Sequence, residues 1–140
     1  MRDELVARWS EVGDKVVELA RAVPEDAYEF RPAAEVRTFA DQLRHVAFWN
    51  DYARDALRGA TPDSSANELP RRQYPDKPSV VEALRKSFDD VRDEIVRRDG
   101  TLGAQDVDTV VSSIEHAGEH YGQLAVYARL RGVVPPASRG

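Results

Sequence analysis

The segment Glu115-His116-Ala117-Gly118-Glu119-His120-Tyr121-Gly122-Gln123 contains two of the three histidines in this 140-residue chain. These two histidines are four residues apart, and on an α-helix that spacing places both imidazoles on one face, one turn from each other. In this arrangement they can hold a single metal ion. The third histidine, His45, lies about 70 residues upstream in another helical pattern. We therefore expect the fold to bring His45 to this pair.

The residues around the segment predict a helix that starts near Asp106 or Asp108 and ends at Arg131-Gly132. Its main apolar stripe consists of Val110, Ile114, Ala117, Tyr121, Leu124 and Ala128. A second stripe beside it consists of His116, His120, Gln123 and Tyr127. Gly118 and Gly122 each cost about 1 kcal/mol of helix propensity relative to Ala. Close approach of a neighbouring helix or of a ligand is the expected compensation.

Three further amphipathic helices are predicted upstream. The first covers residues 3–22, and the second runs from Thr38 as its N-cap to Gly59. The third opens at 78–82 with a capping box formed by Ser79 and Glu82, and it stops at 99–100. In the second helix, His45 and Trp49 lie on the margin of the apolar stripe, where they face inward or into a cleft.

A polar connection with three prolines covers residues 60–77, between the second and third helices. A loop of this length is uncommon in a compact domain, which indicates a functional segment or a crossover. The chain shows no strand alternation and no internal repeat. The predicted fold is therefore an all-α four-helix bundle that occupies residues 1–140 as one domain.

Composition excludes several classes of protein. Basic residues are dispersed among acidic ones and the net charge is −5, so no nucleic-acid interface is expected. No segment approaches the roughly 20 apolar residues that span a bilayer. The charged N-terminus is followed by no apolar signal region. The absence of cysteine excludes disulfides, thiolate metal ligands and a cysteine nucleophile, and it fits a cytoplasmic protein.

Three neutral imidazoles with one open coordination position form the ligand set of a catalytic zinc site. The same nitrogen donors suit Ni²⁺, Fe²⁺ or Cu²⁺. A pair of histidines four residues apart is common on exposed helix faces and is a weak signal alone. Two facts strengthen it here: His45 and the pair all lie beside apolar stripes, and the chain has no other histidine.

Residues 116–120 also match H-x-x-E-H, the inverted zinc-protease signature, in which the glutamate is the general base. In this helix Glu119 lies about 60° from His116, on the side away from the apolar stripe. We therefore interpret Glu119 as a solvated surface residue.

Several stretches together resemble the DinB-like superfamily of metal-binding four-helix bundles. They are VPEDAYEFRP at 23–32, TFADQLRHV at 38–46, HAGEHYGQL at 116–124, YARLRG at 127–132 and the prolines at 135–136. The resemblance covers nearly the whole chain. Its most specific part is H-x-x-x-H-x-G-Q followed by tyrosine, glycine and the proline pair.

The resemblance implies that His45, His116 and His120 ligate a divalent metal at one end of the bundle. The metal is expected to be zinc or nickel, with iron or manganese as alternatives. Homodimers are common among such proteins. Tyr121 replaces the usual arginine after the second histidine of the pair, which leaves a local surface contact in doubt. Relatives include bacillithiol- or mycothiol-dependent S-transferases and a maleylpyruvate isomerase with an additional C-terminal domain, for which this chain has no room.

Three functions remain open from the sequence. The first is a metal-dependent transferase that presents a low-molecular-weight thiol (bacillithiol, mycothiol or glutathione) to a small-molecule electrophile. Trp49, Gln123 and Tyr127 could line its pocket, although Trp49 and Tyr127 also suit plain core positions. The second is a metal-dependent hydrolase. The third is a non-catalytic module whose metal is structural and whose role is dimerisation or ligand sensing.

The hydrolase needs a general base near the metal, and the sequence offers three candidates: Glu119, Glu115 and Asp41. The sequence names no catalytic residue for the transferase, because its nucleophile comes from the thiol.

Overall fold

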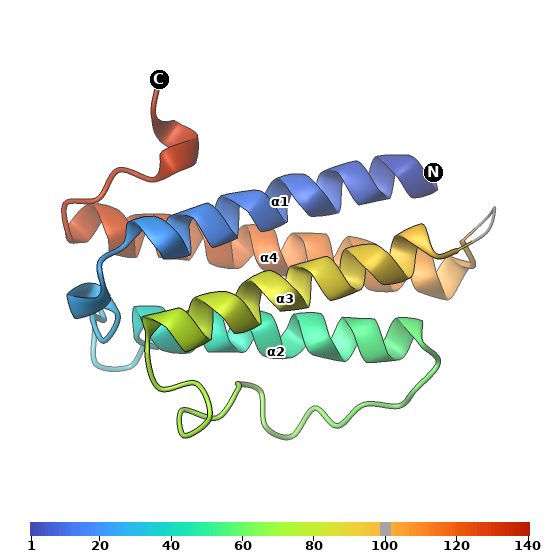
Figure 1. Ribbon diagram of the computed structural model, residues 1–140, viewed down its shortest axis with the longest axis horizontal. Coiled ribbons are helices and arrows are strands. Elements are labelled where there is room, and N and C mark those ends of the chain that lie inside the picture. The colour runs from blue at the N-terminus through green and yellow to red at the C-terminus, as the bar shows by residue number, and fades with distance from the viewer. Residues whose placement is uncertain (99–101) are drawn as a thin grey trace.

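Four long helices lie side by side along one axis in the computed structural model, which describes residues 1–98 and 102–140 (Figure 1). They are α1 (Arg2–Ala22), α2 (Phe39–Leu57), α3 (Lys77–Val96) and α4 (Ala104–Leu130). Two 3₁₀ turns, η1 (Glu25–Ala27) and η2 (Pro136–Ser138), flank them, and the described residues contain no strand. The predicted all-α four-helix bundle is confirmed.

Each helix packs against two others: α2 contacts α3 and α4, and α1 contacts the same two helices. Helices α2 and α3 run in one direction, and α1 and α4 run in the other (Figure 1). The connection over 58–76 therefore returns along the whole bundle before α3 begins. The long polar connection expected at 60–77 is this crossover. It leaves α2 and α4 as antiparallel neighbours, which places His45 opposite the histidines of α4.

The core lies between the four helices and is filled by the apolar stripes of each one. Its fully buried large side chains include Trp9, Leu19, Leu43, Leu84, Ile95 and Leu124. Trp9 also satisfies its indole N–H, which donates to the carbonyl of Phe88 at 2.9 Å. This bond joins α1 to α3 inside the core, where an unpaired N–H would be costly.

The start of α3 differs from the prediction. Asp76 is its N-cap, and the carboxylate of Asp76 accepts from the N–H of Ser79 at 3.1 Å. The Ser79 hydroxyl oxygen accepts from the N–H of Asp76 at 3.2 Å, which completes a capping box. The predicted box between Ser79 and Glu82 was wrong because Ser79 is the third helical residue rather than the cap. Pro78 fits the first turn, where its missing N–H is not needed.

The other helix boundaries lie close to the predicted ones. The Thr38 hydroxyl caps α2 by accepting from the N–H of Asp41 at 3.0 Å, as expected. Helix α4 begins at Ala104, slightly before the predicted start. The stop predicted at 99–100 lies outside the described residues.

A neighbouring helix or a ligand was expected to approach Gly118 and Gly122 closely, and no helix of this chain does so. Both are exposed, and a Cβ atom added at either position would meet nothing within 4 Å. The two glycines therefore lie on the outer surface of α4, away from the other three helices.

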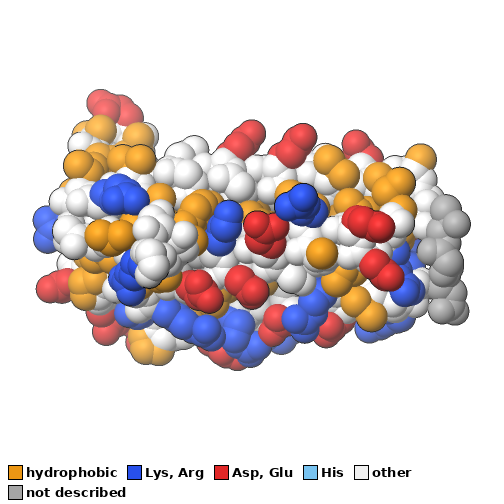
Figure 2. Space-filling model, turned by 90° about the horizontal axis from the view of Figure 1, so that it is seen from above, with side chains coloured by type: hydrophobic (Ala, Val, Ile, Leu, Met, Phe, Trp, Pro, Cys, Tyr) orange, Lys and Arg blue, Asp and Glu red, His pale blue; other side chains and the backbone are white. Residues whose placement is uncertain are grey.

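The surface mixes charges of both signs. On the face in Figure 2, lysine and arginine side chains are interspersed with aspartate and glutamate. None of the described helices is long and apolar enough to cross a membrane.

Candidate metal centre

The bundle brings the three histidines together between α2 and α4. The ring centroid of His45 lies 5.0 Å from that of His116 and 4.7 Å from that of His120, and the two rings of α4 are 4.5 Å apart. One potential ligand atom from each residue lies within 4.8 Å of the others. His45 and His120 are 7% and 8% exposed. The three residues form a buried cluster that could bind a metal ion.

The tautomer of His45 follows from its hydrogen bond to the crossover. Its Nδ1 lies 2.8 Å from the backbone carbonyl oxygen of Asn67. A carbonyl oxygen only accepts, so Nδ1 carries the proton. The neutral ring then has its lone pair on Nε2, which lies 3.0 Å from Nε2 of His116. Hence His45 points an unprotonated nitrogen at the centre of the cluster.

The same logic applies to His120. Its Nδ1 lies 2.8 Å from Oε1 of Gln42, a side chain that is 2% exposed. Nδ1 donates to this oxygen, which leaves the lone pair on Nε2. Metal-ligating histidines usually donate their other ring N–H to such a partner, which fixes the tautomer and the ring orientation. Both His45 and His120 have this second partner.

The nitrogen separations fit a metal centre. Two nitrogens bound at about 2.0–2.1 Å, with an angle of roughly 90–110° at the ion, lie roughly 3.0–3.4 Å apart. The 3.0 Å between the Nε2 atoms of His45 and His116 matches this range. Because the cluster extends to 4.8 Å, its widest pair has to draw inward, on the order of 1 Å, to share one ion.

Burial keeps the imidazoles neutral. The pKa of His116 is lowered to about 4, mainly by burial and to a lesser extent by the neighbouring His45 and the charge of Arg37. Burial likewise lowers the pKa of His120 to about 4, with the two other histidines and Arg37 acting in the same direction. The pKa of His45 is also lowered, mainly by burial. At pH 7 the cluster therefore presents lone pairs, the form that a metal ion requires.

These pKa values predict that the metal-free protein loses stability as the pH falls from about 6.5 to 4. In that window the unfolded chain binds protons at His116 and His120 that the folded protein excludes, so the free energy of unfolding decreases with falling pH. The loss is on the order of 3 kcal/mol for each histidine. Urea titrations in a chelator at pH 7, 5 and 4 measure it, with roughly 2 kcal/mol of the loss for each histidine reached by pH 5. A His116→Phe variant should show a shallower dependence, and an equal dependence would contradict this assignment.

Gln42 is predicted to tune metal affinity through His120. Gln42→Leu removes the acceptor of the His120 Nδ1–H and should weaken metal binding by about 10–100-fold. Gln42→Glu keeps an acceptor oxygen and should retain the affinity. Competition titration against a chromophoric chelator gives both constants. Equal weakening in both variants would show that Gln42 acts through packing alone.

The crossover supplies the hydrogen-bond partner of the His45 Nδ1–H through the backbone of Asn67. This residue has φ +65°, a left-handed conformation that asparagine tolerates better than most side chains. Its carbonyl holds His45, and its side-chain Oδ1 accepts from the indole N–H of Trp49 at 2.8 Å. Sequence reasoning missed Asn67 and Gln42. Gln42 could have been found, because it lies three residues before His45 on the same helix face.

The acidic residues proposed as a general base are all turned away from the histidines or engaged elsewhere. Glu115 and Glu119 are exposed. Asp41 receives hydrogen bonds from Arg44 at 2.8 Å and from Arg71 at 2.6 Å. No carboxylate among the described residues hydrogen bonds to a histidine of the cluster.

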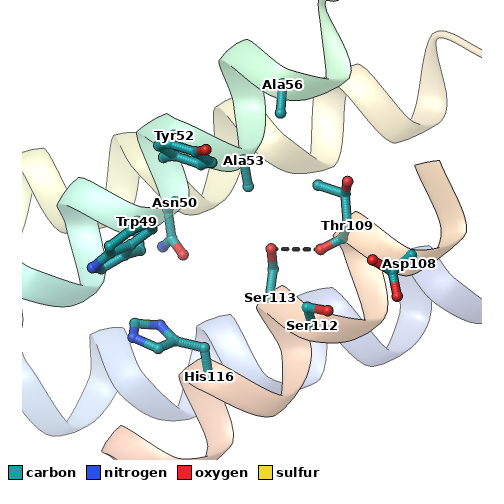
Figure 3. Close-up of a pocket in the computed structure, with 10 residues that line it drawn as sticks. All are labelled: Trp49, Asn50, Tyr52, Ala53, Ala56, Asp108, Thr109, Ser112, Ser113 and His116. Carbon is teal, nitrogen blue, oxygen red and sulfur yellow. Dashed lines mark hydrogen bonds between the residues drawn. The ribbon is translucent and has the colours of Figure 1, made fainter. Parts of the chain in front are cut away.

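The three predicted cofactor-binding residues do not share one pocket. Trp49 lines a groove between α2 and α4 that also includes His116 (Figure 3). Gln123 and Tyr127 line a second pocket, together with Gln42. Gln123 is exposed, whereas Tyr127 is buried and its hydroxyl donates to the carbonyl of Arg37 at 2.8 Å. That they bind a cofactor stays a prediction.

The fold and the cluster define a class: four-helix bundles with a crossover and a buried three-histidine cluster that could bind a metal ion. The family model of the DinB superfamily matches residues 8–124, and the chain belongs to this superfamily. The matched range includes all three histidines. A search of curated proteins found no match.

Proposed function

We propose that this protein is a metal-dependent transferase that uses a low-molecular-weight thiol. The observation that carries the proposal is a cluster of three neutral imidazoles, in which His45 and His120 point lone pairs inward, with no hydrogen-bonded carboxylate among the described residues beside them. A divalent ion held there, zinc or nickel first among the candidates, would lower the pKa of a thiol that binds it. The chain has no cysteine, so the thiol is a cofactor.

The environment of the cluster favours a thiol over a water nucleophile. Hydrolysis needs a base to take a proton from water, and the candidates in the sequence do not reach the histidines. Glu68 is the acidic residue whose charge acts on His45, and it is paired with Arg37. A thiol whose proton is lost on binding the metal needs no such base.

A polar pocket beside the cluster suits the thiol cofactor. Its volume is about 440 Å³, and its lining includes Arg37, Glu68, Gln123 and Tyr127. Gln42 lines this pocket and also accepts a hydrogen bond from His120, so the pocket lies next to the histidine cluster. Glu68 engages only Nε of Arg37, so the remaining guanidinium N–H groups would donate to a carboxylate of bacillithiol or glutathione, and Gln123 offers further hydrogen bonds.

A thiol-transfer assay tests the proposal. Metal-loaded protein is incubated with bacillithiol, mycothiol or glutathione and the electrophile monobromobimane. We expect turnover with at least one thiol, lost after chelation and in His45→Ala, and retained in Glu119→Gln as the matched surface control. No turnover with any of the three thiols would overturn it. Thiol-independent ester hydrolysis that is lost in Glu68→Gln would instead favour the hydrolase.

We further propose a homodimer formed through the outer surface of α4. The side chains of Val111 and Val126 are 39% and 55% exposed there, and Gly118 and Gly122 add an open backbone surface. These positions form one stripe on the helix. A helix of a second copy could approach closely at the glycines.

Light scattering during gel filtration tests the dimer. Gly122→Arg should give monomers of 15.7 kDa, whereas Gly122→Ala should keep the dimer. A wild-type chain that is monomeric at every concentration would contradict the proposal.

A further inference from the structure

A second cavity, distinct from the polar pocket, opens on the other side of His116. It is a groove of about 450 Å³ between α2 and α4 (Figure 3). Trp49, Asn50 and Ala53 line it from α2, and Ser112, Ser113 and His116 line it from α4. The ring centroids of Trp49 and His116 are 6.4 Å apart in an edge-to-face arrangement. The groove therefore starts at the histidine cluster and extends along the two helices away from it.

Asn50 points a free hydrogen-bond acceptor into this groove. Asn50 is 2% exposed, and its Nδ2 donates to the hydroxyl oxygen of Ser87 at 3.0 Å. The Ser87 hydroxyl donates its only proton to the carbonyl of Leu84, so it must accept from Asn50, which fixes the orientation of the amide.

No described residue donates to Oδ1 of Asn50. No described side-chain oxygen or nitrogen is both fully buried and unpaired, so Oδ1 reaches the groove surface. Figure 3 shows the amide directed into the space between the helices. An acceptor on a buried, rigidly held side chain favours a ligand with an N–H or O–H donor.

The rest of the lining limits the ligand further. Trp49 and Tyr52 supply aromatic surface, and Ala53 and Ala56 leave room beside it. The described part of the lining contains no lysine or arginine, and its single charged residue is Asp108. The groove therefore has nothing to neutralise an anion, and its apolar walls favour a flat, uncharged molecule.

We propose that the α2–α4 groove binds a neutral aromatic molecule that donates a hydrogen bond to Oδ1 of Asn50. If the proposed transferase function holds, this molecule is the electrophilic co-substrate, placed on the opposite side of His116 from the thiol pocket. That role rests on the proposed function, whereas binding itself needs neither the metal nor the thiol.

The ligand chemistry is tested by titrating metal-free ¹⁵N-labelled protein with three probes. Indole carries the ring and the N–H donor, 1-methylindole lacks the donor, and indole-3-carboxylate adds a negative charge. We expect indole to shift the amide signals of Ala53 and Ser113. 1-Methylindole should bind at least about 5-fold more weakly, as loss of one hydrogen bond predicts. The carboxylate keeps the N–H donor but should also bind at least about 5-fold more weakly, because the groove has no cation to offset the loss of its hydration. Equal affinity for all three, or shifts confined to residues outside the groove, would overturn the proposal.

Three variants test the location of the site and its hydrogen-bond acceptor. Ser112→Leu fills the groove and should weaken indole binding at least 10-fold, whereas Val111→Leu, on the exposed side of the same helix, should leave it unchanged. Asn50→Leu should remove the preference for indole over 1-methylindole. Unchanged binding in Ser112→Leu would overturn the assignment. Because these titrations omit thiol and metal, a failure here is distinguishable from a failure of the transferase assay.

Discussion

His45→Ala is expected to weaken metal binding by at least about 100-fold. Losing a residue that only accepts the outer N–H of a metal-bound histidine costs about 10–100-fold, and losing the histidine itself should cost more. The variant removes the candidate ligand that α2 contributes to the cluster and leaves the pair on α4. In the wild type, an ion present at 100 times its dissociation constant adds about 2.7 kcal/mol to the free energy of unfolding. Elemental analysis and thermal melts with zinc, nickel or a chelator should show this stabilisation in the wild type and its loss in the variant.

Glu115→Ala provides the matched control, since this residue is exposed on α4 one position before the first ligand of that helix. It should bind metal and melt like the wild type. If the wild type takes up no ion under any loading condition, both the transferase and the hydrolase are excluded, and a non-catalytic bundle remains. If the variant binds as tightly as the wild type, His45 is not a ligand.

Arg44→Met is expected to destabilise the fold by about 3 kcal/mol and to weaken metal binding as well. The Arg44 side chain is 2% exposed; it donates to the carbonyl of Tyr74 at 3.0 Å and to Asp41 at 2.8 Å. Asp41 keeps its pair with Arg71, but the carbonyl of Tyr74 loses its donor, which costs about 1–3 kcal/mol, and the bond from Arg44 to Asp41 is lost as well. Because Tyr74 belongs to the crossover, the loss should also loosen the segment that carries Asn67. Urea unfolding and a metal titration measure the two effects.

Arg85→Met is the control for this prediction. Arg85 pairs with Glu82 and Asp89 on the surface of α3 and is 39% exposed, so its loss should cost less than about 1 kcal/mol. Similar losses in the two arginine variants would show that the position of Arg44 under the crossover has no special importance. A stability loss without any change in metal affinity would separate the crossover from the histidine cluster.

The helical spacing of apolar residues and of histidines predicted most of the fold and the central part of the candidate site. The apolar stripe of the last helix placed Val110, Ala117 and Leu124 in the core, and all three are buried. The spacing of His116 and His120, and the position of His45 beside its stripe, correctly indicated that the three would meet. These features repeat with the helix, so a single sequence reveals them.

The parts that were missed depend on atoms without a sequence pattern. His45 is held by a backbone carbonyl of the crossover, and any residue type at position 67 has a carbonyl. Trp49 and Gln123 each follow a histidine on its helix, yet they line different cavities. Because α2 and α4 are antiparallel, the residues that follow the histidines on the two helices lie toward opposite ends of the bundle. The glycines of α4 were assigned to a close contact, but a glycine in a helix does not tell which side of the helix is covered.

The crossover has a kinetic consequence. His45 and His116 are in contact although they are 71 residues apart in sequence. The connection that returns along the bundle lies between them in the chain. Contacts with so large a separation form late, after most of the chain has been ordered. A metal ion can therefore bind all three histidines only once α2 and α4 are docked. Because the ion binds only after this docking, bound metal should slow unfolding of the protein while leaving its refolding rate nearly unchanged.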